Sequence, residues 1–239
     1  ELGTDPAGAF ATVKARLDAL VAYAAKTSAY TATVSDHTLN VTSGSFTLDL
    51  PAASTCTGQS LRVKNAGTGV VTLDGNSSET VEGVATFPLG PGSYVEIAST
   101  GSAWVLVGGV PDTGWRIITA DLAALTNMTW HSQCSIRRVG STVTVLLRGV
   151  DGGAVNGTAY TVPSGFRFRS GVVDAMWVIG NYSDRTNQGT LTTESGGDSL
   201  AWTTPSNGST WAVLATYPTT QAWPTSLPEA ARRALVRCF

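Results

Sequence analysis

The chain has 239 residues, enough for two domains of ordinary size. Hydrophobic residues make up 42% of it and charged residues only 13%, which excludes disorder of the highly charged kind. A net charge of −2 argues against nucleic-acid binding, and no apolar run is long enough to insert into a membrane. Its polarity comes from Ser, Thr, Gly and Asn, and 26 scattered glycines predict an all-β protein of many short strands.

The first element expected is an N-terminal helix. Asp5 and Pro6 form a helix start, and Ala9–Lys26 is dominated by good helix formers. Apolar residues at spacings of three and four make one stripe along it: Phe10, Val13, Leu17, Leu20 and Ala24. A lone helix cannot bury this stripe within its own segment. Residues 1–28 are therefore expected to form a short coiled coil between copies of the chain, or else to pack on the chain's own β domain.

Residues 29–110 are expected to form a β-sandwich domain. Leu61 and Val63 alternate with Arg62 and Lys64, as in a strand with one buried face. The predicted strands are Tyr30–Val34, His37–Val41, Phe46–Leu50, Ser60–Lys64, Val70–Asp74, Glu79–Val81, Tyr94–Ala98 and Trp104–Val107. No repeat of fixed period is present, so neither a propeller nor a solenoid is expected.

A second β-rich domain is expected over residues 111–239, after a linker at residues 108–114. Its strand signals are the buried-face residues Val143, Val145 and Leu147, the apolar run 172–179, and the alternating residues Trp211, Val213 and Ala215. Together these features predict an all-β chain with a helical N-terminus and two sandwich-like or barrel-like domains.

Residues suited to catalysis or metal binding are scattered. The two histidines, His37 and His131, lie in no metal-binding or nucleophile motif, so no metal and no cofactor are expected. The segment 74–79 resembles a calcium loop but lacks the spaced acidic ligands, and a hairpin turn is expected there. Carboxylates that could serve a polysaccharide-cleaving enzyme are not paired by the sequence: Asp174, Asp184, Glu194 and Asp198. We therefore do not expect an enzyme.

Three cysteines stand far apart in the sequence: Cys56, Cys134 and Cys238. Their number and spacing fit neither a zinc site nor a disulfide framework. Free thiols are expected. A link between Cys56 and Cys134, or one between chains through Cys238, is the alternative.

Aromatic residues in the second domain suggest carbohydrate binding. Sugars stack their apolar faces on aromatic rings, and Asn, Asp and Arg supply directional hydrogen bonds. Two loops, at residues 180–185 and 198–207, combine these residue types. The candidate ligand-binding residues are Asn181, Tyr182, Asp184, Arg185, Trp202 and Asn207.

Several segments resemble phage tail-fibre and receptor-binding proteins. In the N-terminal half these are DPAGAFATVKARLDAL at 5–20, YTATVSDHTLNVTSGSFTLDLPAAS at 30–54, LRVKNAGTGVVTLDG at 61–75 and PGSYVEIASTGSAWVLVG at 91–108. In the C-terminal half IRRVGSTVTVLLRG at 136–149, TVPSGFRFRS at 161–170 and TYPTTQAWPTSLP at 216–228 resemble the distal domain of minor tail proteins from phages of high-GC, actinobacterial-type hosts.

This resemblance implies a homotrimeric spike on the virion, with a coiled coil, a β-sandwich shaft and a β-rich tip. The tip is expected to bind host cell-surface carbohydrate without turning it over. The N-terminus is expected to attach to other virion proteins, of the tail or of the capsid. A capsid head fibre or decoration protein is the first alternative, and a depolymerase of host polysaccharide is the second.

Overall fold

A computed structural model describes residues 23–168, 176–181, 188–193, 198–204 and 210–228. The protein is all-β, and the described residues contain no α-helix, only the short 3-10 turns η1 (Ala53–Thr55) and η2 (Thr119–Asp121). The chain divides into two compact units between Asp112 and Thr113, close to the expected boundary at residue 110. We call residues 1–112 unit 1 and residues 113–239 unit 2.

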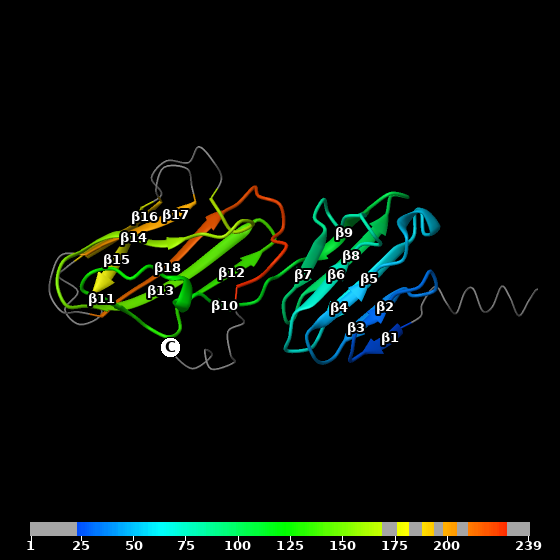
Figure 1. Ribbon diagram of the computed structural model, residues 1–239, viewed down its shortest axis with the longest axis horizontal. Coiled ribbons are helices and arrows are strands. Elements are labelled where there is room, and N and C mark those ends of the chain that lie inside the picture. The colour runs from blue at the N-terminus through cyan, green and yellow to red at the C-terminus, as the bar shows by residue number, and fades with distance from the viewer. Residues whose placement is uncertain (1–22, 169–175, 182–187, 194–197, 205–209, 229–239) are drawn as a thin grey trace, which may run out of the picture. The chain divides into compact units, whose positions relative to one another are not determined.

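Unit 1 contains two sheets (Figure 1). The five-stranded sheet has the order β1 (Tyr23–Lys26), β3 (Thr38–Val41), β5 (Ser60–Asn65), β8 (Tyr94–Ser99) and β9 (Trp104–Val110). The four-stranded sheet has the order β2 (Tyr30–Thr31), β4 (Phe46–Asp49), β6 (Val71–Asp74) and β7 (Thr86–Leu89).

The first six strands alternate between these two sheets. As a result β1, β3 and β5 run parallel in one sheet, and β2, β4 and β6 run parallel in the other. Parallel neighbours need a crossover connection, and here a strand of the opposite sheet provides it. The chain therefore winds like a short solenoid, contrary to the expectation. The aligned residues Tyr23, Thr38 and Arg62 are separated by unequal lengths of chain, so no fixed period marks the winding.

Antiparallel strands β7, β8 and β9 complete the two sheets. The expected alternation is confirmed in β5, where Leu61 and Val63 are buried and Arg62 is exposed. The strand expected at Glu79–Val81 is wrong, because only Val81 makes an isolated bridge. Instead β7 forms the edge of its sheet, a position that tolerates a proline such as Pro88.

The segment expected as a linker begins inside a strand. Residues 108–110 belong to β9 and pair with β8. Gly109 has φ of 85°, and a Cβ there would lie 2.3 Å from the Tyr94 carbonyl oxygen, so only glycine fits. A glycine-rich sequence here reflects close strand pairing rather than a flexible joint.

The helix expected up to Lys26 is wrong at its C-terminal end. Residues 23–26 form β1, which pairs in parallel with β3, and Ala24 therefore lies in a strand and not in a helical seam. The Asn40 side-chain amide donates a 2.7 Å hydrogen bond to the Tyr23 hydroxyl, and Lys26 Nζ lies 3.2 Å from the Tyr30 ring centroid. Backbone pairing with β3 outweighs the helix propensity of Ala and Lys. Four stripe residues lie outside the described residues: Phe10, Val13, Leu17 and Leu20.

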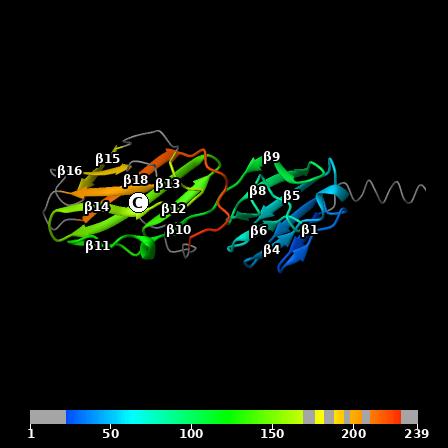
Figure 2. The same ribbon diagram turned by 45° about the horizontal axis from the view of Figure 1, so that its top comes forward.

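Unit 2 is built on one nine-stranded sheet. Its path runs β10 (Arg116–Ile117), β12 (Ser135–Val139), β13 (Thr142–Asp151), β18 (Thr210–Pro218), β15 (Met176–Asn181), β16 (Gln188–Thr193), β17 (Ser199–Thr204) and β14 (Val155–Thr161), and β11 (Met128–Trp130) pairs with β13 beside this path. Strands β13 and β18 run side by side in both views (Figure 1 and Figure 2).

One core cluster joins the ends of this sheet. Ile136 of β12 and Val155 of β14 belong to the same buried cluster although their strands lie near opposite ends of the path, so the sheet must curve around the core. In β18 the predicted alternation is confirmed: Trp211, Val213 and Ala215 are buried. Each fully buried large apolar side chain contributes about 1.5–3 kcal/mol to folding.

Arg138 ties two connections of unit 2 together. Its guanidinium donates to the carbonyl oxygens of Gly165 and Ala222, the latter at 2.8 Å, and to that of Gln221 at 2.9 Å. It also lies 5.0 Å from the Trp223 ring centroid. Burial lowers the pKa of Arg138 to about 10. The Arg138 side chain therefore has a structural role, because it holds the backbone near Gly165 and the backbone at residues 221–222 together.

Candidate functional site

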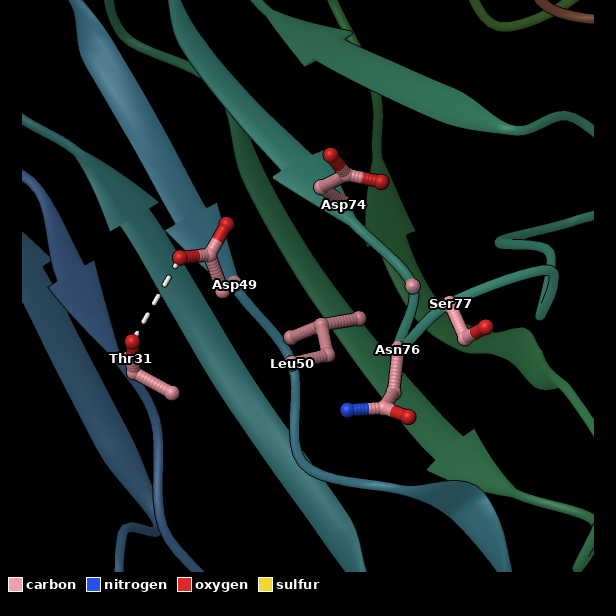
Figure 3. A pocket seen from close by; sticks show the side chains of 7 residues that line it. Thr31, Asp49, Leu50, Asp74, Asn76 and Ser77 are labelled. Atoms are coloured by element: carbon pink, nitrogen blue, oxygen red, sulfur yellow. Dashed lines mark hydrogen bonds between the residues drawn. The ribbon is translucent and has the colours of Figure 1, made fainter.

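A polar pocket of about 350 Å³ lies at the carboxyl ends of the parallel strands β2, β4 and β6 of unit 1 (Figure 3). It is lined by Thr31, Asp49, Leu50, Asp74, Gly75, Asn76 and Ser77. Pockets that bind small molecules usually measure about 300–1,000 Å³, so this one suits a small ligand or one end of a larger ligand.

Strand register aligns three polar residues of the pocket. Thr31 pairs with Asp49, and Asp49 pairs with Asp74 on the next strand. Neighbouring strands lie about 4.8 Å apart, and residues in register point to the same face of a sheet. The three side chains therefore form a row at the end of the sheet. The Thr31 hydroxyl donates a 3.4 Å hydrogen bond to Asp49 Oδ2, drawn as the dashed line in Figure 3.

The floor and the far side of the pocket come from the residues that follow these strands. Leu50 is buried, and its amide donates a 2.8 Å hydrogen bond to the Asp74 carbonyl oxygen. A Cβ on Gly75 would lie 2.5 Å from the Glu79 carbonyl oxygen, so this position requires glycine. Beyond it Asn76 and Ser77 are exposed on the loop. Ser77 has φ of 56°, an uncommon backbone conformation for a residue with a side chain.

The pocket carries concentrated negative charge. Asp49 is exposed and Asp74 is half-buried, and no Lys or Arg lines the pocket. Two like charges at 4 Å repel by about 1 kcal/mol in water, and by more where solvent is partly excluded. Ionised carboxylates only accept hydrogen bonds, whereas Asn and Ser also donate them. The pocket can therefore bind a molecule rich in hydroxyl groups.

In the loop at residues 74–79, which resembles a calcium site, the last acidic residue is Glu79, and its carboxylate binds a backbone amide outside the loop. Both carboxylate oxygens of Glu79 accept a hydrogen bond from the Ala53 amide, at 3.0 and 2.9 Å. In the part of the chain that the structure describes, no three His, Cys, Asp or Glu residues gather as a metal site would require. The loop joins the antiparallel strands β6 and β7, but Asp74 pairs with Thr86, so the connection is long and not a tight turn.

The expected ligand-binding role of Trp202 is wrong. Its side chain is 0% exposed and belongs to the core cluster of unit 2. The ring packs edge-on against Trp130, with centroids 5.4 Å apart and an interplanar angle of 84°. A ring buried in this way cannot stack on a sugar. Burial follows from the inward-facing position of Trp202 on β17, which the sequence pattern of its loop did not indicate.

Of the other predicted contact residues, the structure describes only Asn181. Asn181 is the last residue of β15 and pairs with Trp211 of β18. The remaining four lie outside the described residues: Tyr182, Asp184, Arg185 and Asn207.

The row of Thr31, Asp49 and Asp74 in unit 1 was not predicted from the sequence, although the sequence contains a signal for it. The triplet Thr-Leu-Asp occurs at residues 47–49 and again at residues 72–74. In the structure these triplets pair residue by residue on parallel strands. A repeated triplet that ends in Asp could have been interpreted as two aligned strands, but only if parallel pairing had been considered.

Two of the three cysteines are free and buried. Cys56 lies in unit 1 and Cys134 in unit 2, which confirms the prediction of free thiols for this pair. Burial raises the pKa of the Cys134 thiol, so it is a poor nucleophile. Cys238 lies outside the described residues.

No protein-family model and no curated protein sequence matches this chain. Within the described ranges, no helix has the length and apolar character needed to cross a membrane. The role of the pocket therefore has to be argued from its own geometry.

Proposed function

We propose that this protein is a non-catalytic adhesin of a phage virion, a tail fibre or receptor-binding protein that attaches to glycans on the host cell surface. The observation that carries the glycan part of the proposal is the polar pocket at the ends of β2, β4 and β6. The resemblance of the quoted segments to phage tail proteins supports the virion part.

The pocket has the features that a sugar site needs. Carboxylate, amide and hydroxyl groups around it supply directional hydrogen bonds. Thr31, Asp49 and Asp74 stand on three paired strands, so their spacing is fixed before a ligand arrives. Such preorganisation lowers the entropy lost on binding.

The framework is consistent with a fibre protein. The segments that resemble tail proteins include residues 61–75, 91–108 and 136–149, and each of them covers strands of a described sheet. We propose that the N-terminal residues before β1 trimerise the chain through Phe10, Val13, Leu17 and Leu20, and attach it to other virion proteins.

Unit 2 contributes a second contact region in this proposal. Its candidate residues are Asn181, Tyr182, Asp184, Arg185 and Asn207. Trp202 is excluded from this set because it is buried.

The pair Asp49 and Asp74 also raises the alternative of a depolymerase, because glycosidases use two carboxylates. The two carboxylates of a glycosidase flank the bond that is cleaved, whereas Asp49 and Asp74 stand side by side in register on neighbouring strands of one sheet. We therefore favour binding without cleavage. Incubation of the chain with host cell-wall polysaccharide should release no new reducing ends, and a steady release would establish the enzyme instead.

Electron microscopy of virions tests the virion part of the proposal. Gold-labelled antibody against the purified chain should decorate the tail. Labelling of the head would establish the alternative of a head fibre or decoration protein. Virions that stay unlabelled, while the antibody still detects the purified chain, would contradict a virion role.

A further inference from the structure

The described cations of unit 1 do not neutralise the pocket. Lys26 Nζ lies 3.2 Å from the Tyr30 ring centroid. Arg62 pairs with Glu96, with Nε 3.3 Å from Oε2. Lys64 Nζ donates a 2.6 Å hydrogen bond to the Gly92 carbonyl oxygen. Each of the three is engaged in the contact given above, and none of them lines the pocket.

The carboxylates of the pocket are therefore available to a ligand. Asp49 receives one long hydrogen bond from Thr31, which leaves most of its acceptor capacity unused by that contact. A carboxylate can accept hydrogen bonds from two neighbouring donors at once. Adjacent hydroxyl groups on a sugar ring present such a pair of donors. Asp49 and Asp74, in register on neighbouring strands, can each take one pair or share one sugar ring between them.

The same two charges exclude acidic ligands. A sugar that carries a carboxylate or a phosphate would bring a third negative charge beside Asp49 and Asp74. Juxtaposed like charges suppress binding of the wrong partner. Specificity therefore follows from repulsion as well as from hydrogen bonding.

We propose that this pocket binds an uncharged sugar ring through adjacent hydroxyl groups and rejects acidic sugars, with Asp49 and Asp74 as the residues that determine this specificity. The inference deepens the proposed glycan-binding function and rests on it. It assigns a ligand class to unit 1, separate from the contact region proposed on unit 2.

Ligand-observed saturation-transfer NMR on the full chain tests this inference with matched sugar pairs. The probes are the methyl glycosides of glucose and galactose and the corresponding methyl uronides, which differ only by the carboxylate at C6. At low ionic strength at least one neutral glycoside should bind. The affinity for its uronide should be lower by a factor of roughly ten or more. Equal binding of both members of every pair, or no binding of any neutral glycoside, would overturn the inference.

Two isosteric variants locate the effect. Asp49→Asn and Asp74→Asn each remove one charge, keep the side-chain shape and should at least halve the ratio of neutral to acidic binding. Glu96→Gln removes one charge from the opposite sheet, where Glu96 pairs with Arg62, and should leave the ratio unchanged. A Glu96→Gln variant that changes the ratio as much as Asp74→Asn would overturn the assignment to the pocket. Thermal melting of each variant checks that the fold is retained.

The experiments distinguish failure of this inference from failure of the proposed function. Labelled virions together with unselective sugar binding would overturn only the inference. Selective sugar binding together with unlabelled virions would overturn only the virion role.

Discussion

The indole Nε1 of Trp211 donates a 2.8 Å hydrogen bond to Oδ2 of Asp151 inside unit 2. Both residues are buried, and the same carboxylate oxygen accepts a 3.0 Å hydrogen bond from the Thr204 hydroxyl. Strand β13, which ends at Asp151, is thereby joined through one side chain to β17 and β18. A buried carboxylate is tolerated only when such donors surround it.

Loss of this donor should destabilise unit 2. Trp211→Phe removes the indole N–H and part of the ring, and leaves a buried acceptor short of a partner. The expected cost is about 1–3 kcal/mol from the acceptor alone, which lowers the melting temperature by several degrees. Leu214→Ala on the same strand is the control, because Leu214 is 59% exposed and its truncation should change little. Equal melting temperatures for the two variants would show that the hydrogen bond is unimportant.

Two buried tyrosines should make unit 2 sensitive to alkaline pH. Burial raises the pKa of Tyr160, with a further contribution from Asp121, and burial raises the pKa of Tyr217. The unfolded chain releases these protons near pH 10, whereas the folded unit retains them. Their contribution to the free energy of unfolding is therefore complete below about pH 10 and is lost as the pH rises further.

Tyr160→Phe isolates this effect. The Tyr160 hydroxyl is buried and finds no hydrogen-bond partner in the described structure, so its removal costs no hydrogen bond. Denaturant unfolding above pH 10 should show a shallower loss of stability with pH in this variant. Tyr94→Phe, which alters an exposed tyrosine of unit 1, should keep the slope of the unaltered chain. An unchanged slope in Tyr160→Phe would contradict the assignment.

The glycine behind the polar pocket should be essential to the shape of the pocket. Gly75→Ala would place a Cβ 2.5 Å from the Glu79 carbonyl oxygen, so the loop with Asn76 and Ser77 has to move. We expect a lower melting temperature and loss of neutral-glycoside binding. Gly152→Ala is the control, since its nearest neighbour would be 4.0 Å away. Full sugar binding by Gly75→Ala would mean that this loop does not form the pocket wall.

The oligomeric state tests the N-terminal stripe separately. Light scattering should give three times the 24.7 kDa mass of one chain. Leu17→Asn together with Leu20→Asn should reduce this to the mass of one chain, because polar side chains disrupt a coiled-coil seam. Ala24→Ser should leave the trimer intact, since Ala24 belongs to β1. A single-chain mass for the unaltered protein would refute the trimer.

Local patterns predicted much of the fold. The alternation of Leu61 with Arg62 and of Trp211 with Ala212 is a property of neighbouring residues, and it correctly indicated strands with one buried face. The all-β class followed from the same patterns and from the turn residues between them.

Local patterns did not predict which strands pair when the strands are distant in the sequence. The triplet that ends at Asp49 is repeated at Asp74, but it indicates their pairing only when parallel strands are expected, and the parallel register here depends on two sheets formed in alternation. For the same reason residues 23–26 were expected to continue a helix, although pairing with β3 makes them a strand. Trp202 was assigned to the surface because loop composition does not reveal which face of a strand is buried.

Competition for adsorption tests the central claim most directly. Purified chain, added to host cells before the virions that we propose carry it, should reduce virion adsorption in a saturable way. Asp49→Asn combined with Asp74→Asn should compete less well, and Glu96→Gln should compete as well as the unaltered chain. Adsorption that is unchanged at saturating concentrations of the folded chain would contradict its role as the host-binding adhesin.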